Sequence, residues 1–313
     1  MTEQNDDRRE CALCRSRELR RVLEGTDRRF GAPGVFQVVR CDDCGLMFQD
    51  PMPAREEVEG FCEVPRAGGK SSRLFDAHAG IVNASRARFL CAHAPAGRVL
   101  DVGCGNGDFL AQAKKRGWDV TGVELSALAC EEAAARLGGN VYRGDLAELE
   151  LPAGSFDAAT LWHVLEHITT PHELLEELNR VLKPGGALIV EVPDCGNPVF
   201  RAFRQHYFHL DLPRHVFFYD RATLRAMIEG HGFAVDSEDA PSWYYPEGIA
   251  KSMGYLLEGE GNGKTRWRKA LSLMACPFFL LVTCGYLAAT RLGAHAEVAR
   301  IVAIKPSENH GIR

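Results

Sequence analysis

The sequence predicts an α/β protein in which a doubly wound, mostly parallel sheet is preceded by a small metal-bound segment. Three observations lead to this fold class. Between residues 96 and 240, short apolar runs alternate with helical patterns, as they do in a parallel sheet covered by helices on both faces. The first of these runs ends in a turn with glycine at every second position, Gly103, Gly105 and Gly107. Two closely spaced cysteine pairs lie near the amino terminus.

The amino-terminal cysteines form the pairs Cys11/Cys14 and Cys41/Cys44. Each pair can present two thiolates to one side of a tetrahedral ion, which is the two-knuckle form of a zinc ribbon. Four sulfurs close the coordination shell, so we expect a structural Zn²⁺ rather than a catalytic one. The interval from Arg15 to Arg40 is longer than the usual spacing, and a turn at residues 31–34 would absorb the excess. A redox-active dithiol is the alternative, but it requires only one pair in a thioredoxin-like context.

Linker and turn residues follow, and then the alternating pattern begins. Proline-rich residues 51–53 and residues 65–72 read as linker, and a helix is expected over residues 75–93. Pro171 suits the first turn of a helix, whereas residues 183–186 (Lys-Pro-Gly-Gly) should end it. We expect strands at 98–103, 118–124, 140–143, 156–162, 186–192, 232–235 and 299–304, and helices at 107–116, 126–137, 171–182 and 221–231.

The glycine-rich turn predicts a cofactor pocket. An apolar strand ending at Asp101-Val102 leads through the glycines into a helix, which places bare backbone and a positive helix end against a small charged ligand. The third glycine is followed by Asp108, so the spacing departs from the dinucleotide fingerprint G-x-G-x-x-G. Two further acids, Glu124 and Asp145, end or follow the next two strands. A carboxylate such as Glu124 can accept from two adjacent hydroxyls.

This ordered triple of glycine turn, strand-end acid and third-strand acid resembles the class I S-adenosylmethionine-dependent methyltransferases over about residues 95 to 240. The resemblance implies a Rossmann-like, seven-stranded sheet whose last strand, 299–304, is antiparallel and inserted between the two before it. It also implies S-adenosylmethionine as the cofactor. The implied binding residues are Gly103 and Gly105 at the methionine part, Asp101 near the ammonium group, His163 at the methionine end, Glu124 at the ribose, Leu125 at the adenine ring, and Asp145 at the adenine amino group. Cys104, between the two glycines, and Leu146, next to Asp145, are included among the cofactor-binding residues.

Length and charge limit the class of protein. The 313 residues suffice for one sizeable core and an appendage, and the net charge of −5 does not support a broad nucleic-acid-binding surface. The arginines of the first forty residues read as a solvated rim. The polar start of the chain carries no secretory pattern, so we expect a cytoplasmic protein. The expected division is a zinc-ribbon-like domain at 1–60, a linker and lead-in helix at 61–95, the cofactor-binding core at 96–240, an apolar helical insertion at 241–295, and the last core strand and tail at 296–313.

The insertion contains a charge-free, largely apolar run over residues 270–290, preceded by basic residues from Lys264. A single membrane span would separate strands that belong to one sheet, so we disfavour a full crossing. Peripheral contact with the inner face of the membrane through residues 264–290 and burial at an oligomer interface or over the active site both remain open.

Two histidines are the candidate catalytic residues. His215 lies in the loop between the fifth strand and the next helix. This loop resembles one in zinc-containing sugar C-methyltransferases, in which a histidine acts as the base. In those enzymes a glutamate precedes the histidine, whereas this chain has Arg214 at that position. His167 follows the fourth strand and is the second choice, with a loop-stabilising role as its alternative. We expect methyl transfer to a small-molecule acceptor: a sugar, a secondary metabolite or a lipid-linked glycan intermediate. An RNA-modifying enzyme that uses the zinc ribbon to bind RNA, and a cofactor-binding scaffold without catalysis, are the alternatives.

Overall fold

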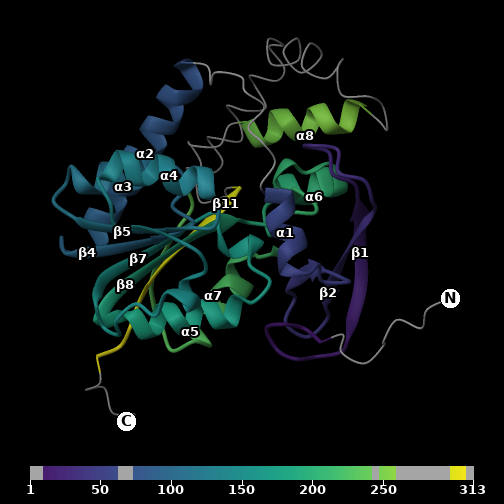
Figure 1. Cartoon of the computed structure of the whole chain (residues 1–313). Helices are drawn as coiled ribbons and strands as arrows, with labels where there is room; N and C mark the ends of the chain where they lie inside the picture. Colours follow the sequence, from purple (N-terminus) through teal and green to yellow (C-terminus); the bar gives the residue numbers. More distant parts are fainter. Residues whose placement is uncertain (1–9, 63–72, 242–246, 259–296, 308–313) are drawn as a thin grey trace. The chain divides into compact units, whose positions relative to one another are not determined.

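The computed structural model describes residues 10–62, 73–241, 247–258 and 297–307 (Figure 1). These residues form two compact units, and both are discontinuous in sequence. The first unit takes its described residues from Met1–Phe61, Pro193–Ala226 and Ala240–Ala299. The second takes them from Cys62–Val192, Met227–Asp239 and Arg300–Arg313.

The second unit is built on a seven-stranded sheet with the order β10-β11-β8-β7-β4-β5-β6. Neighbouring strands from β8 to β6 are parallel, whereas β11 is antiparallel to β10 and lies between β10 and β8. This arrangement confirms the predicted fold class and the insertion of the last strand. The strands are β4 (Arg98–Val102), β5 (Asp119–Glu124), β6 (Val141–Arg143), β7 (Phe156–Trp162), β8 (Leu182–Pro193), β10 (Ala234–Asp239) and β11 (Val298–Ile304).

Helices follow the strands as the alternating pattern requires. On α5 (Pro171–Val181), Leu174, Leu178 and Val181 recur at helical spacing and are buried, and the proline occupies the first turn. The Ser126 side chain accepts from the amide of Ala129 and so caps α4 (Ala127–Leu137). The other helices that begin or end in this unit are α2 (Arg73–His93), α3 (Asp108–Lys114) and α7 (Arg221–Glu229), with 3₁₀ turns at Leu146–Leu149 (η1) and Leu165–His167 (η2).

Strand β8 begins earlier than the expected residue 186. Leu182 is already in register with Phe156 of β7, and the register shifts between Phe156 and Ala158. The ammonium group of Lys305 donates to the carbonyl of Leu182, and the amide of Gly185 donates to the carbonyl of Lys305. The Lys-Pro-Gly-Gly segment therefore ends the helix as expected but lies at the irregular start of the strand.

The first unit contains a four-stranded sheet with the order β1-β2-β3-β9. Its first three strands belong to residues 11–49, which carry the four amino-terminal cysteines and are called the cysteine-bearing segment below. Strand β9 comes from the loop region around His215. Met47 and Phe48 of β3 pair antiparallel with Phe218 and Phe217 of β9. The elements are β1 (Leu19–Gly25), β2 (Phe36–Cys41), β3 (Met47–Gln49), β9 (Phe217–Phe218), α1 (Arg55–Cys62), α6 (Pro198–Phe203) and α8 (Glu247–Glu258), with 3₁₀ turns at Arg204–His206 (η3) and Phe208–Leu210 (η4).

The apolar run 270–290 lies outside the described residues, so its role stays a prediction. Within the ranges given above, none of the helices has both the length and the apolar character needed to cross a bilayer.

Candidate functional site

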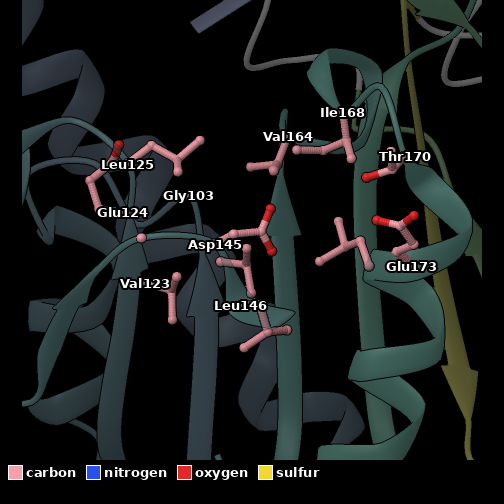
Figure 2. Close-up of a pocket in the computed structure, with 13 residues that line it drawn as sticks. Gly103, Val123, Glu124, Leu125, Asp145, Leu146, Val164, Ile168, Thr170 and Glu173 are labelled. Atoms are coloured by element: carbon pink, nitrogen blue, oxygen red, sulfur yellow. The ribbon is translucent and has the colours of Figure 1, made fainter. Parts of the chain in front are cut away.

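A hollow opens at the carboxyl ends of β4 and β5 in the second unit, with about 500 Å³ of space when its opening to solvent is included (Figure 2). Its walls come from the turns after these strands, from the turn after β6, and from the residues that connect β7 to α5. Because ligands of open α/β sheets bind at the carboxyl edge, this position is the expected one for a cofactor. The lining residues are Val102, Gly103, Val123, Glu124, Leu125, Gly144, Asp145, Leu146, Val164, Ile168, Thr170, Glu173 and Leu174.

The glycine turn has a backbone that other residues could not adopt without strain. Gly103 has φ +68°, and a Cβ at this position would lie 2.5 Å from a methyl carbon of Val164. Gly105 has φ +55° and open space where a Cβ would be. At Gly103 the missing side chain leaves the backbone accessible to a ligand in the hollow.

Glu124 ends β5 and is held by backbone donors. Its Oε2 accepts from the amide of Gly105 at 2.7 Å, and its Oε1 accepts from the amide of Ser126 at 2.9 Å. The carboxylate thus links the glycine turn to the start of α4 while it lines the hollow.

Asp145 and two leucines form the part of the wall beyond β5. Asp145 caps η1, since its Oδ1 accepts from the amide of Ala147 at 2.9 Å. Leu146 is buried, whereas Leu125 remains 37% exposed beside the hollow. An apolar side chain left accessible at the edge of a concave site can pack on a flat ring.

Asp101, at the end of β4, is a buried acid with a perturbed pKa. The hydroxyl of Thr160 donates to its Oδ1 at 2.6 Å. Burial, and to a smaller extent the charge of Glu124, raises the pKa of Asp101 to about 7, against the Thr160 bond and the charge of Arg86. A carboxyl group in this state gains from a nearby cation. Burial beside Asp101 and Glu124 raises the pKa of Cys104, so this thiol is neutral at physiological pH.

His163 follows β7 in a left-handed conformation, with φ +58°. Its Nδ1 lies 3.3 Å from Oε1 of Glu166, and its Nε2 lies 3.4 Å from Oε1 of Glu191. Burial alone would lower the pKa of His163, but the two carboxylates outweigh this effect and raise it. Glu191 is fully buried and also pairs with Arg86 and Arg300, and these cations hold its pKa well below the ordinary value.

Five of the nine predicted cofactor residues line the hollow: Gly103, Glu124, Leu125, Asp145 and Leu146. Asp101, Cys104, Gly105 and His163 are neighbours of the lining residues in sequence but do not line the hollow themselves. The wall formed by residues 164–174 was not anticipated. The only feature of the sequence that could have indicated this wall is its position, because these residues connect a predicted strand to the next helix at the same edge of the sheet.

His167, the second catalytic candidate, ends η2. Its Nδ1 lies 3.9 Å from the sulfur of Cys62. The ring is half-buried, and its amide donates to the carbonyl of Val164 in the same turn. These contacts fit the loop-stabilising role as well as a chemical one.

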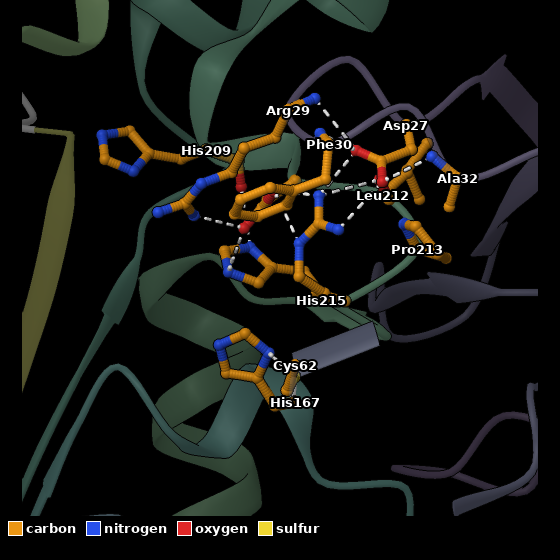
Figure 3. Close-up of polar contacts among 12 residues, drawn as sticks. Asp27, Arg29, Phe30, Ala32, Cys62, His167, His209, Leu212, Pro213 and His215 are labelled. Carbon is orange, nitrogen blue, oxygen red and sulfur yellow. Dashed lines mark hydrogen bonds and ion pairs between the residues drawn. The ribbon is translucent and has the colours of Figure 1, made fainter. Parts of the chain in front are cut away.

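His215 lies in the first unit, where its ring contacts the preceding loop residues His209 and Asp211 (Figure 3). Its Nδ1 lies 2.9 Å from the carbonyl oxygen of His209, so Nδ1 is the protonated nitrogen in the neutral ring and Nε2 carries the basic lone pair. Nε2 lies 3.9 Å from Oδ2 of Asp211. The residue is buried, at 7% exposure.

Arg214, at the position where a glutamate was expected, is buried between two carboxylates. Its Nη1 and Nη2 donate to Asp27 at 3.0 and 2.8 Å, and its Nε and Nη2 donate to Asp211 at 3.1 and 2.6 Å. The guanidinium also stacks on Phe30, 4.7 Å from the ring centre. The charge at this position is therefore matched within the described part of the first unit.

The four amino-terminal cysteines converge in the first unit. The sulfurs of Cys11 and Cys44 are 3.4 Å apart and those of Cys14 and Cys41 are 3.5 Å apart, and all four lie within 4.8 Å of one another. Around a tetrahedral zinc with bonds of about 2.3 Å, neighbouring sulfurs would be about 3.8 Å apart. The donor set and its spacing fit a structural Zn²⁺.

Comparisons with known proteins agree with this geometry. The family model described as a methyltransferase domain matches residues 76–238. A protein of Mycolicibacterium smegmatis named as a probable S-adenosylmethionine-dependent methyltransferase is 32% identical over 165 residues, 51% of this chain and 60% of that protein. The demethylmenaquinone methyltransferase of Staphylococcus aureus is 33% identical over 124 residues, 37% of this chain and 52% of the enzyme. Thus the chain spans about half to three-fifths of the length of these relatives.

Among solved structures, a SAM-dependent methyltransferase from Archaeoglobus fulgidus is similar at a TM-score of 0.47 and 20% identity, covering 72% of this chain and 93% of that one.

Proposed function

The chain belongs to the class I S-adenosylmethionine-dependent methyltransferases, and from this premise we propose that it transfers a methyl group from S-adenosylmethionine to a small-molecule acceptor. The acceptor class is a sugar, a secondary metabolite or a lipid-linked glycan intermediate, and His215 is the base. The observation that carries the proposal is the hollow that Gly103, Glu124 and Asp145, which follow three neighbouring strands of the sheet, all line.

The cofactor would supply an electrophilic methyl group on a sulfonium whose leaving group is a neutral thioether. In our proposal, Gly103, Cys104 and Gly105 admit its methionine part. Asp101 faces its ammonium group, which suits a buried carboxyl whose pKa is about 7 without the cofactor. His163 lies at the same end.

At the nucleoside end, Glu124 accepts the ribose hydroxyls, Asp145 the adenine amino group, and Leu125 and Leu146 pack on the base. Glu124 enters this role already oriented, because backbone amides hold both of its oxygens. Such orientation lowers the entropy lost on binding.

For the acceptor, the protein mainly aligns the nucleophile and removes its proton. The fixed tautomer of His215 supports its assignment as base, because Nε2 is the nitrogen that can take the proton. His167 is the second candidate for this role. We further propose that Cys11, Cys14, Cys41 and Cys44 hold one structural Zn²⁺, which stabilises a segment with a small core of its own.

The test has two steps. Calorimetry of the purified protein with S-adenosylmethionine, its demethylated product and NADH should show binding of the first two; binding of NADH alone would refute the cofactor assignment. Incubation with methyl-labelled cofactor and separate extracts of sugar nucleotides, lipids, other metabolites and RNA should label a small-molecule or lipid fraction. Label found in RNA alone would favour the RNA-modifying alternative.

His215→Ala should then keep cofactor affinity and lose about 10² to 10⁴-fold in turnover. Turnover equal to the wild type would dismiss His215 as the base, and the same measurement on His167→Ala would decide the second candidate.

A further inference from the structure

The cysteine-bearing segment holds the backbone on both sides of His215. The side-chain amide of Gln49, the last residue of β3, donates to the carbonyl oxygens of Pro213 at 2.8 Å and of His215 at 2.7 Å. The backbone amide of Gln49 donates to the carbonyl of Val216 at 2.9 Å. Gln49 is 2% exposed, so both side-chain bonds are made away from water.

A second connection runs through Asp27, in the turn between β1 and β2. Its carboxylate accepts from the amides of Arg29, Phe30 and Ala32 at 2.9 to 3.1 Å, which fixes its position in the turn. The same carboxylate receives two bonds from Arg214, the residue before His215 (Figure 3). Two residues of the cysteine-bearing segment therefore make hydrogen bonds to the chain at positions 213–216.

The position of the imidazole depends on these contacts. The ring has its own bond from Nδ1 to the carbonyl of His209, but the place from which the side chain extends is set by the backbone between Arg214 and Val216. An amide group that donates both protons to carbonyls two residues apart fixes the orientation of that backbone. A displacement of about 1 Å in a catalytic group can lower the rate about 10²-fold, so loss of these contacts should affect turnover more than it affects folding.

We propose that Gln49 and Asp27 are positioning residues for the base His215, and that the cysteine-bearing segment serves to build this part of the active site. This inference rests on the proposed function, because it takes His215 as the base. It assigns the segment a role in the methyl-transfer reaction itself rather than in binding RNA.

The test compares Gln49→Leu and Gln49→Glu with the control Gln37→Leu. Gln49→Glu keeps the shape of the side chain but replaces the donors by acceptors that face two carbonyl oxygens. Gln37 lies exposed on β2 of the same sheet, so the control makes the same chemical change away from the loop. Turnover is read as label transferred from methyl-labelled S-adenosylmethionine to the extract fraction that the wild type labels.

We expect both Gln49 variants to lose about 10 to 100-fold in kcat, with the affinity for S-adenosylhomocysteine unchanged and with zinc content and circular dichroism equal to those of the wild type. Spectra of ¹⁵N-histidine-labelled protein should show a changed tautomer balance for His215, assigned by its absence in His215→Ala. Gln37→Leu should match the wild type in every measurement. Should the Gln49→Leu and Gln49→Glu variants fail to fold, Gln49→Asn, which keeps the two donors on a shorter side chain, takes their place with the same expectations.

Three results would overturn the inference: kcat equal to the wild type in the folded variants, an equal loss in Gln37→Leu, or an unchanged His215 signal, whatever the cofactor affinity. A fully active His215→Ala variant would instead refute the proposed base, so failure of the inference and failure of the proposed function are distinguishable.

Discussion

Replacement of Arg214 by methionine should strongly destabilise the protein. In the wild type, four charge-assisted hydrogen bonds join the guanidinium to Asp27 and Asp211, and the three side chains are at most 5% exposed. Methionine keeps most of the volume but leaves two carboxylates buried without this partner. Removal of one member of a buried ion pair typically costs about 3 to 5 kcal/mol, and we expect a loss in the free energy of unfolding of this order.

The loss should depend on pH in a direction set by the two carboxylates. Burial would raise the pKa of Asp27 and Asp211, but Arg214, and for Asp211 first the charge of His215, lower both below the ordinary value. In the wild type, the stability that the ionised Asp27 and Asp211 contribute to the folded state is therefore fully present above about pH 4, the ordinary pKa of an aspartate. This contribution is lost only as the pH falls through the lowered pKa values of the folded state. Without Arg214, burial is opposed by fewer contacts, so the pKa values of both carboxyls rise relative to the wild type and acid protonates the variant first. The difference between variant and wild type should shrink between pH 7 and pH 4.5.

Urea unfolding followed by tryptophan fluorescence and circular dichroism measures this difference at both pH values. Arg20→Met is the matched control, because Arg20 pairs with Asp42 at the surface, where an ion pair is worth about 0 to 1 kcal/mol. A loss below about 1 kcal/mol for Arg214→Met, or a loss that does not change with pH, would refute the reasoning.

Three further predictions concern the cofactor pocket and the cysteines. Because burial raises the pKa of Asp101 to about 7, the folded protein binds more protons than the unfolded chain between about pH 4 and pH 7, and Asp101 lowers the free energy of unfolding as the pH rises through that range. Asp101→Asn should abolish this part of the pH dependence of urea unfolding. An unchanged pH profile would contradict the raised pKa. Glu124→Gln should weaken S-adenosylmethionine binding about 10 to 100-fold in calorimetry, whereas the control Glu131→Gln, on the outer face of α4, should not. If Glu124→Gln binds the cofactor as tightly as the wild type, Glu124 is not part of the ribose site. Removal of zinc by a chelator should release one metal ion per chain, measured by mass spectrometry, and should lower the Tm. Cys41→Ser should lower the Tm in the same way. A zinc-free protein with the Tm of the wild type would refute a structural metal site.

Much of the sheet could be predicted because its signals are local. Strand β7 coincides with the apolar run 156–162, and α5 begins at the proline that suits a helix start. The strand-end acids could be found as well, because their chemistry is visible in the residue type and their place follows from the topology. The start of β8 could not, since it depends on a bulged pairing with Phe156 in another strand.

The surroundings of His215 were beyond prediction for a different physical reason. Gln49 and Pro213 are separated by 164 positions and Asp27 and Arg214 by 187, so no local pattern relates them. Strand β9 has two residues, which is too short for any periodicity. The wall of the hollow at Val164 and Ile168 is apolar, and an apolar side chain gives no chemical sign that it lines a pocket rather than a core.

The position of β11 between β8 and β10 sets an order of events during synthesis. Strand β10 is at the edge of the sheet and β11 is its neighbour, so β10 has no place to dock until residues 298–304 have left the ribosome. Until then the carboxylate of Glu191 in β8 lacks its hydrogen bond from the guanidinium of Arg300. A chain truncated before β11 would therefore lack two strands of the sheet rather than one, and β8 would be left as an open edge with which another chain could pair.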